Sequence, residues 1–250
     1  MQSADQTPGT KCRSILPLRG RLLLCASMVE PGARVADVGA DHGYLGIWLL
    51  RNGTASFVTA AELRRQPLRK AQENAGLFGV SDKMAFLLSD GLHALSPDAA
   101  DTIICAGMGG DLIVRILSEC RWIRNEKYTL ILQPQSGGQD LRRWLAENGF
   151  FAQKEELVKD SGFLYSVMRV RYDGVKRTLS PGEQYAPQVL LRSGRHTAEY
   201  LRRIERSLAS TLDGLSRGTA VPEDKLRYYR QAHSEILERI QNYVNYSTDL

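Results

Sequence analysis

The stretch VADVGADHGYL, residues 35–45, decides the fold because a glycine-containing turn directly follows a short apolar run. Such a turn after the first strand of an α/β sheet lets the backbone approach a ligand and presents the N–H groups of the next helix to it. In dinucleotide-binding proteins the turn has the spacing G-x-G-x-x-G and surrounds a pyrophosphate. Here two carboxylates share the turn with three glycines: Gly39, Gly43, Gly46, Asp37 and Asp41.

The two carboxylates indicate which ligand the turn accepts. They would repel a pyrophosphate, but they attract a ligand that carries an amino group and a sulfonium. The turn therefore favours S-adenosylmethionine over NAD. A second interpretation of Asp41, as a cap of the helix that begins near Gly43, is compatible with this ligand.

Length and composition indicate a folded, cytoplasmic protein. The 250 residues, 43% of them hydrophobic, suffice for one large domain or for one domain with an appendage. The net charge of +5 favours a polyanionic partner only mildly. The four cysteines form no CxxC pair, which predicts reduced thiols and no metal site. The apolar run at residues 22–29 is too short for a membrane span and predicts a buried helix. We expect a monomer.

Short β-branched runs alternate with amphipathic stretches from residue 34 to residue 172. This rhythm is typical of βαβ units around a parallel sheet. The expected parallel strands are Arg34–Val38, Ser56–Ala60, Met84–Leu88, Thr102–Cys105 and Thr129–Leu132. The expected helices between them are Tyr44–Arg51, Arg65–Phe78, Asp111–Glu119 and Asp140–Asn148.

The last two expected strands, Gln153–Lys159 and Leu164–Tyr172, are joined by only four residues, so they should pair antiparallel. Five parallel strands followed by a hairpin predict the α/β fold of a class I, Rossmann-like methyltransferase.

The sequence changes character after residue 173. A turn-rich linker, residues 173–182, precedes two long stretches in which apolar residues recur at intervals of three and four. Gly218 and Pro222 mark the turn between them, so we expect a coiled-coil-like helical hairpin. The chain therefore divides into a methyltransferase domain, residues 1–173, and a helical arm, residues 174–250. The densest basic run lies in this arm, either as a solvated helix face or as a contact for a polyanion: Arg192, Arg195, Arg202, Arg203 and Arg206.

Other polar and glycine residues follow the predicted strands. Glu62, after the second strand, suits the ribose hydroxyls of the donor, and Asp90, after the third, suits its adenine amino group. The run AGMGG, residues 106–110, leaves room for a planar base, although the same glycines also suit a tight turn. Gln133 and Pro134 follow the fifth strand, at the edge where open α/β sheets bind ligands.

Three segments resemble the TrmK family of bacterial tRNA methyltransferases, which methylate N1 of adenine 22. They are RVADVGADHGYL from Arg34, DTIICAGMGGDLI from Asp101 and LILQPQ from Leu130. The layout of linker and arm agrees with that family as well. One departure is Gly46, where the family usually has proline.

The resemblance implies roles for particular residues. The donor would be held by Asp37, Gly39, Gly43, Glu62, Asp90, Gly91 and Gly107. Asp41, His42 and Tyr44 would surround the methyl group. Gly107, Met108 and Gly109 would lie at the methyl-transfer site as well. From their places after the predicted strands and in the basic run, we expect the substrate to contact Met108, Gly109, Gly110, Gln133 and Pro134, together with Arg195, Arg202 and Arg206 on the arm.

The expected reaction needs no base, because adenine N1 carries an in-plane lone pair at neutral pH. Positioning should dominate, and an acceptor near the N6 amino group would stabilise the charge that develops on the ring. Asp41 is the best candidate for that acceptor, and His42 and the carbonyl edge near Gly107 are others. Tyr44 would stack on the flipped-out base or form a hydrogen bond to it. Two alternatives stay open: a methyltransferase of a small molecule or protein, and a non-catalytic RNA-binding module.

Overall fold

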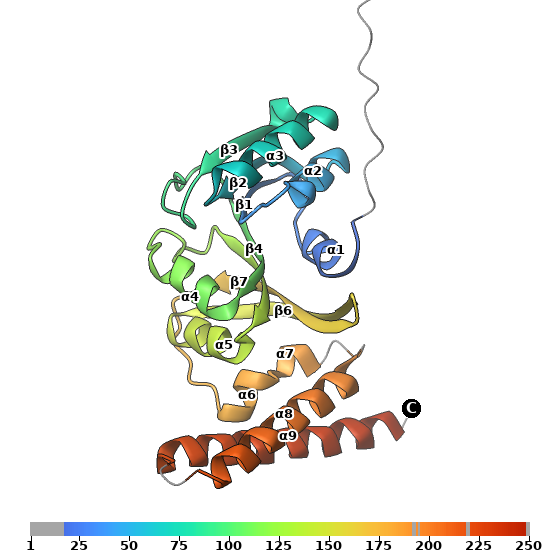
Figure 1. Cartoon of the computed structure of the whole chain (residues 1–250), viewed down its shortest axis with the longest axis vertical. Coiled ribbons are helices and arrows are strands. Elements are labelled where there is room, and N and C mark those ends of the chain that lie inside the picture. Colours follow the sequence, from blue (N-terminus) through green and yellow to red (C-terminus); the bar gives the residue numbers. More distant parts are fainter. Residues whose placement is uncertain (1–17, 192–193, 195, 219–220, 249–250) are drawn as a thin grey trace, which may run out of the picture.

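The computed structural model describes residues 18–191, 194, 196–218 and 221–248. Seven strands form one sheet in the order β3-β2-β1-β4-β5-β7-β6 (Figure 1). Their bounds are β1 Ala33–Val38, β2 Ala55–Glu62, β3 Met84–Leu88, β4 Thr102–Gly109, β5 Thr129–Ser136, β6 Phe150–Asp160 and β7 Phe163–Tyr172. The first five are parallel to one another, and β7 runs antiparallel to both β5 and β6. The predicted methyltransferase fold is confirmed.

β4 is longer than the sequence predicts. The predicted strand ends at Cys105, yet pairing with β5 continues to Gly109 through register shifts on both sides of Met108. Gly107 has a φ of +77°, which a residue with a side chain rarely adopts. The glycine run therefore forms an irregular strand end rather than only a turn.

Helices cover both faces of the sheet (Figure 1). On one face Ile113, Ile116 and Leu141 belong to the core beneath α4, Gly110–Ser118, and α5, Gly138–Glu147. These two helices begin one and two residues earlier than predicted. On the other face Cys25 and Ile47 belong to the core beneath α1, Gly20–Ser27, α2, Tyr44–Arg51, and α3, Arg65–Leu77. A short 3-10 helix, η1, spans Ser81–Lys83.

The predicted buried helix near residues 22–29 is thus α1, although Leu23 on it is 41% exposed. Cys25, Cys105 and Cys120 are buried and free. The fourth cysteine, Cys12, lies outside the described residues.

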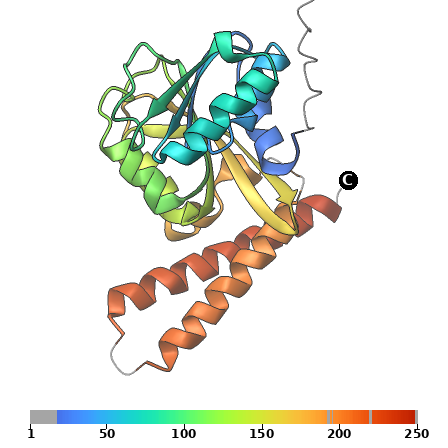
Figure 2. The ribbon, with the colours of Figure 1, turned by 45° about the horizontal axis from the view of Figure 1, so that its top comes forward.

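The arm contains more than the predicted hairpin. α6, Pro181–Tyr185, begins inside the predicted linker, because Ser180 and Glu183 form a capping box at its start. A second short helix, α7, Gln188–Leu191, follows it. The long helices α8, Thr197–Ser216, and α9, Glu223–Thr248, then lie side by side (Figure 2).

A third apolar cluster joins the arm to the sheet domain. Leu157 of β6 and Leu164 of β7 pack with Leu190, Leu201 and Ile236. Within the arm, His233 of α9 and Glu205 of α8 form a hydrogen bond, with 3.1 Å between Nε2 and Oε1. The arm thus rests on the β6–β7 hairpin, while the exact domain boundary at residue 173 stays a prediction.

Candidate active site

A cavity of about 370 Å³ opens at the carboxyl ends of β1, β2 and β4. It collects most of the residues that the sequence assigned to the donor and to methyl transfer. Those lining it are Asp37, Gly39, Asp41, His42, Tyr44, Glu62, Gly107 and Met108. Parallel strands bring their carboxyl ends to one edge of the sheet, which is why residues far apart in sequence meet here.

The loop after β1 is shaped by left-handed backbone conformations. Gly39 and Gly43 have φ values of +70° and +72°, and Asp41, a non-glycine, has +49°. A Cβ atom on Gly39 would collide with the methyl group at the flexible end of Met108, so a larger residue would be strained by the positive φ and would displace the Met108 side chain. Gly43 caps α2 and no side chain caps this helix, so the interpretation of Asp41 as a helix cap is wrong.

Glu62 links the ends of β1 and β2. Its Oε2 accepts a hydrogen bond from the backbone N–H of Asp41 and its Oε1 one from that of Arg64, both at 3.3 Å. A carboxylate offers about four lone-pair sites, so both oxygens can still accept hydroxyl protons. Glu62 can therefore hold the loop and a ribose at once.

Asp37 is the most deeply buried acid in the cavity, with 4% of its surface exposed. Burial raises the pKa of its carboxyl to about 7, the backbone N–H of Gly46 partly opposes this, and Glu62 adds to the rise. A buried acid of this kind is stabilised in its charged form by a cation. The ammonium and sulfonium of S-adenosylmethionine fit this requirement.

Gly46 has a local role that the sequence did not reveal. Its N–H is the hydrogen-bond donor to Asp37, and a proline at this position would lack that donor. A Cβ atom on Gly46 would also lie 2.7 Å from Cγ1 of Val58. Glycine at position 46 thus supports the Asp37 carboxylate and the close packing of α2 on β2.

The raised pKa of Asp37 makes donor binding depend on pH. The ionised fraction of this carboxyl grows as pH rises towards about 7, and the ionised form is the one that attracts a cation. Affinity for S-adenosylmethionine should therefore rise roughly tenfold from pH 5.5 to pH 7. Calorimetry in buffers of different ionisation enthalpy should also detect proton release on binding.

The control for this prediction is Asp37→Asn, which keeps the shape and removes the titration. Any pH dependence that remains in this variant belongs to the donor's own amino group. Equal pH dependence in the variant and the wild type would contradict the assignment to Asp37.

Asp41, His42 and Tyr44 lie on the open rim of the cavity. The side chains of Asp41 and His42 are 66% and 49% exposed, with 3.6 Å between Oδ2 and Nε2. The rings of His42 and Tyr44 are tilted, with 5.9 Å between their centroids. Asn74 donates to the carbonyl of His42 at 2.9 Å and so fixes the loop from α3. Polar and aromatic groups on an open rim suit an incoming base.

The predicted substrate residues Gly109, Gly110, Gln133 and Pro134 lie at or beside the ends of β4 and β5 and do not line this cavity, although Gln133 contacts Gly107, which does. Gln133 is fully buried; its Oε1 accepts the Gly107 N–H at 3.0 Å, and its Nε2 donates to the Pro134 carbonyl. A Cβ on Gly110 would collide with the carbonyl oxygen of Gly137, so these two backbones must touch. The substrate roles predicted for Gly109, Gly110, Gln133 and Pro134 stay predictions.

Three predicted donor residues, Gly43, Asp90 and Gly91, do not line this cavity. The exposed carboxylate of Asp90, after β3, binds Arg115 of α4 at 2.7 Å, and this hydrogen bond holds its pKa below the usual range. Gly91 has a φ of +57°, and a Cβ there would lie 2.9 Å from Ile116. Contact between Asp90 and an adenine amino group stays a prediction. The Asp90 carboxylate would then have to bind this amino group and Arg115 at the same time.

The arginines predicted to form a basic run on the arm differ in their surroundings. Arg202 and Arg206 are exposed on α8, whereas Nη1 of Arg203 donates to the carbonyl of Leu164 at 2.8 Å. Arg192 and Arg195 lie outside the described residues.

Arg21 of α1, which the sequence did not assign to the site, lines the active-site cavity. Its Nη1 binds Asp160 at 2.8 Å. The only signal in the sequence was a cation beside an apolar run.

Among the residues that the structure describes, no group of three or more His, Cys, Asp or Glu side chains could hold a metal ion. In the same part of the chain, no helix combines the length and apolar character that crossing a bilayer requires.

Comparisons with known proteins agree with this geometry. A family model described as "Methyltransferase domain" matches residues 18–168. The tRNA (adenine(22)-N(1))-methyltransferase of Bacillus subtilis is 32% identical over 179 residues, which cover 69% of this chain and 74% of that protein. A putative tRNA methyltransferase of Mycoplasma pneumoniae is 35% identical over 54% of this chain and 61% of its own length.

Solved structures extend the likeness to the arm. The crystal structure of the B. subtilis M1A22 tRNA methyltransferase TrmK has a TM-score of 0.80 and 27% identity, covering 90% of this chain and 99% of that one. A Streptococcus pneumoniae protein solved in complex with S-adenosyl-L-methionine has a TM-score of 0.74 and 29% identity, covering 88% of this chain and 98% of that one. This chain belongs to the TrmK family of tRNA (adenine(22)-N1)-methyltransferases.

Proposed function

We propose that this protein transfers a methyl group from S-adenosylmethionine to N1 of adenine 22 in tRNA. The observation that carries the proposal is the cavity at the sheet edge, in which a buried acid, Asp37, lies behind an open rim formed by Asp41, His42 and Tyr44. The inner acid matches a cationic donor, and the rim matches a base that enters from outside. We also propose that the protein works as a cytoplasmic monomer.

The chemistry requires positioning more than proton transfer. S-adenosylmethionine supplies an electrophilic methyl group when it is bound. Asp37 and Glu62 would hold the donor, and Tyr44 would stack on the flipped-out adenine. Asp41 would accept a hydrogen bond from the N6 amino group, whose acidity grows as the ring becomes cationic, so this bond strengthens towards the transition state. Because N1 is unprotonated at neutral pH, none of these residues has to remove a proton before the methyl group moves.

The direct test is radiolabelled methyl transfer to an unmodified tRNA that has adenine at position 22. We expect one methyl group per tRNA, and primer extension should stop at that nucleotide. A tRNA with guanine at position 22 should accept none. Label on another nucleotide would contradict the proposed site. Label on a small molecule or protein but not on tRNA, or tRNA binding without transfer, would support one of the two alternatives.

We further propose that the arm holds the tRNA backbone through Arg202 and Arg206. Changing both to glutamine should weaken tRNA binding and lower the magnitude of the log-affinity versus log-salt slope by about 0.7–0.9 for each lost phosphate contact. Fluorescence titrations at several salt concentrations would measure the slope.

The matched control changes two exposed arginines, Arg121 and Arg124, which precede β5 and so lie at the amino ends of the parallel strands. Their replacement by glutamine should leave the slope close to that of the wild type. Equal slopes for both double variants, with circular dichroism showing intact helices, would mean that Arg202 and Arg206 only solvate α8.

A further inference from the structure

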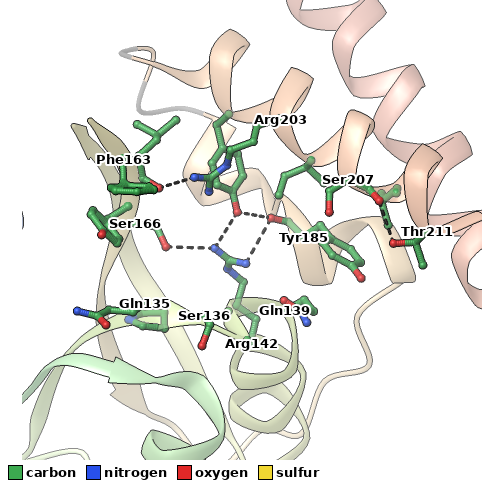
Figure 3. Close-up of a pocket in the computed structure, with 18 of the residues that line it drawn as sticks. Gln135, Ser136, Gln139, Arg142, Phe163, Ser166, Tyr185, Arg203, Ser207 and Thr211 are labelled. Carbon is green, nitrogen blue, oxygen red and sulfur yellow. Dashed lines mark hydrogen bonds between the residues drawn. The ribbon is translucent and has the colours of Figure 1, made fainter. Parts of the chain in front are cut away.

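A second cavity, of about 480 Å³, lies between the carboxyl end of β5, the β6–β7 hairpin and α8 (Figure 3). We call it the hairpin–arm cavity. The mechanism proposed above does not use it. Its lining includes Ser136, Gln139, Phe163, Tyr165 and Arg203, and none of the described residues that line it is acidic.

The hairpin–arm cavity adjoins the active-site cavity. Gln135 lines the former, and its Nε2 would lie 3.7 Å from a Cβ atom on Gly107, which lines the latter. Arg21 lines the active-site cavity, and its guanidinium carbon lies 5.8 Å from the ring centre of Tyr165, which lines the hairpin–arm cavity. A nucleic acid strand that places one base in the active site would therefore carry a neighbouring nucleotide to the hairpin–arm cavity.

One wall of the hairpin–arm cavity is aromatic and open to solvent. Phe163 is 64% exposed, the largest fraction among the large hydrophobic side chains that the structure describes as exposed. Tyr165 lies two residues further along β7 and therefore on the same face, with 6.3 Å between the two ring centres. Exposed aromatic rings in a groove are the usual platform for an unstacked nucleobase.

The opposite wall supplies positive charge. Arg203 of α8 uses Nη1 to bind the Leu164 carbonyl at 2.8 Å, which holds its guanidinium beside Phe163 (Figure 3). A guanidinium has five N–H groups, so this bond leaves others to bind a phosphate. Arg142 also lines the hairpin–arm cavity, but it is buried and its charge is balanced by Glu155. Arg203 is therefore the cation of this cavity that is suited to a ligand.

We propose that the hairpin–arm cavity binds a nucleotide adjacent to the target adenosine of tRNA. Its base stacks on Phe163 and Tyr165, and its phosphate contacts Arg203. The inference rests on the proposed function, because a neighbouring nucleotide exists only if a tRNA adenosine occupies the active site. It adds a second contact that keeps the strand unstacked while the target base is flipped out.

The test measures the binding of tRNA and of S-adenosylmethionine separately. Phe163→Ala should weaken tRNA binding by about 5- to 150-fold, the range for losing one base–aromatic stack, and leave donor affinity unchanged. Phe163→Trp should bind tRNA as tightly as the wild type, because it keeps the stacking surface. Leu237→Ala, which removes a 44% exposed side chain of α9 outside the cavity, should have no effect.

Abasic tRNAs identify the nucleotide involved. One tRNA lacks the base immediately 5′ of position 22, and another lacks the base immediately 3′. With one of the two, the wild type and Phe163→Ala should bind equally, because the stacking partner is gone. A penalty that persists with both abasic tRNAs, or an affinity of Phe163→Ala within about twofold of the wild type, would overturn the inference.

The outcomes separate this inference from the proposed function. If the wild type methylates adenine 22 but Phe163→Ala binds tRNA as tightly as the wild type, only the proposed role of the hairpin–arm cavity is wrong. If one abasic tRNA removes the difference in affinity between the wild type and Phe163→Ala, but the wild type does not methylate adenine 22, the role of the hairpin–arm cavity is supported and the proposed reaction is wrong.

Discussion

Replacing Arg142 by methionine should lower the free energy of unfolding by about 3–5 kcal/mol, since it leaves a buried carboxylate without its partner. Arg142 of α5 is 6% exposed and Glu155 of β6 only 1%. The guanidinium Nε lies 3.2 Å from both carboxylate oxygens, and Nη2 makes a further bond to Oε1. Burial is the largest influence on the charge of Arg142 and opposes it, but the attraction and hydrogen bonds of Glu155 and Tyr200 together outweigh burial and raise the pKa of the guanidinium.

Arg142 also ties the arm to the sheet domain. Its Nη1 donates to the carbonyls of Gln184 and Tyr185 at 2.9 and 3.3 Å, while Nη2 reaches Ser166 of β7 and Tyr200 of α8. One side chain thus links α5 to both strands of the hairpin, the end of α6 and the start of α8. Loss of Arg142 should therefore loosen the arm as well as destabilise the core.

Urea denaturation followed by circular dichroism would measure the stability of Arg142→Met. The double variant Arg142→Met/Glu155→Leu is the matched control, because it removes the orphaned charge together with its partner. It should recover most of the lost stability. It should still bind tRNA more weakly than the wild type, since the Gln184 carbonyl has lost its donor, while donor affinity stays unchanged. Equal instability of the single and double variants would contradict the role of the ion pair.

The predictable part of this fold is the part set by local patterns. The parallel strands and the β6–β7 hairpin follow from apolar runs and short connections, and residues at strand ends had to meet at one edge of the sheet. This is why Asp37, Glu62 and Gly107 could be assigned to one site from sequence alone.

The unpredicted part depends on partners that are distant in sequence. Arg21 meets Asp160, Arg115 takes the carboxylate of Asp90, and Arg142 collects groups from four other elements. No periodicity marks such pairs, because an arginine on a helix usually points to solvent. The extension of β4 was missed for a related reason, since pairing with β5 overrides the low strand preference of glycine.

Asp41→Ala should lower the single-turnover rate of methyl transfer by about 10²- to 10³-fold, while affinities for the donor and tRNA change by only a few-fold. In the protein alone the Asp41 side chain is 66% exposed, so water satisfies it. A base and a donor that fill the cavity would exclude that water and leave the N6 amino group as its partner. The bond gains strength only as the adenine ring becomes cationic, so its loss appears in the rate rather than in binding.

Two further variants separate charge from shape at position 41. Asp41→Asn keeps a hydrogen-bond acceptor but loses the negative charge, so its rate should lie between those of the wild type and Asp41→Ala. His42→Ala tests the neighbouring ring, which lies 3.6 Å from the Asp41 carboxylate and should affect the rate less if it only orients that group. Rapid quenching at saturating donor and tRNA would give all four rates. If Asp41→Ala lost rate and donor affinity in equal measure, the carboxylate would belong to the donor site with Asp37 and Glu62, and charge stabilisation would fall to His42 or to the carbonyl edge near Gly107.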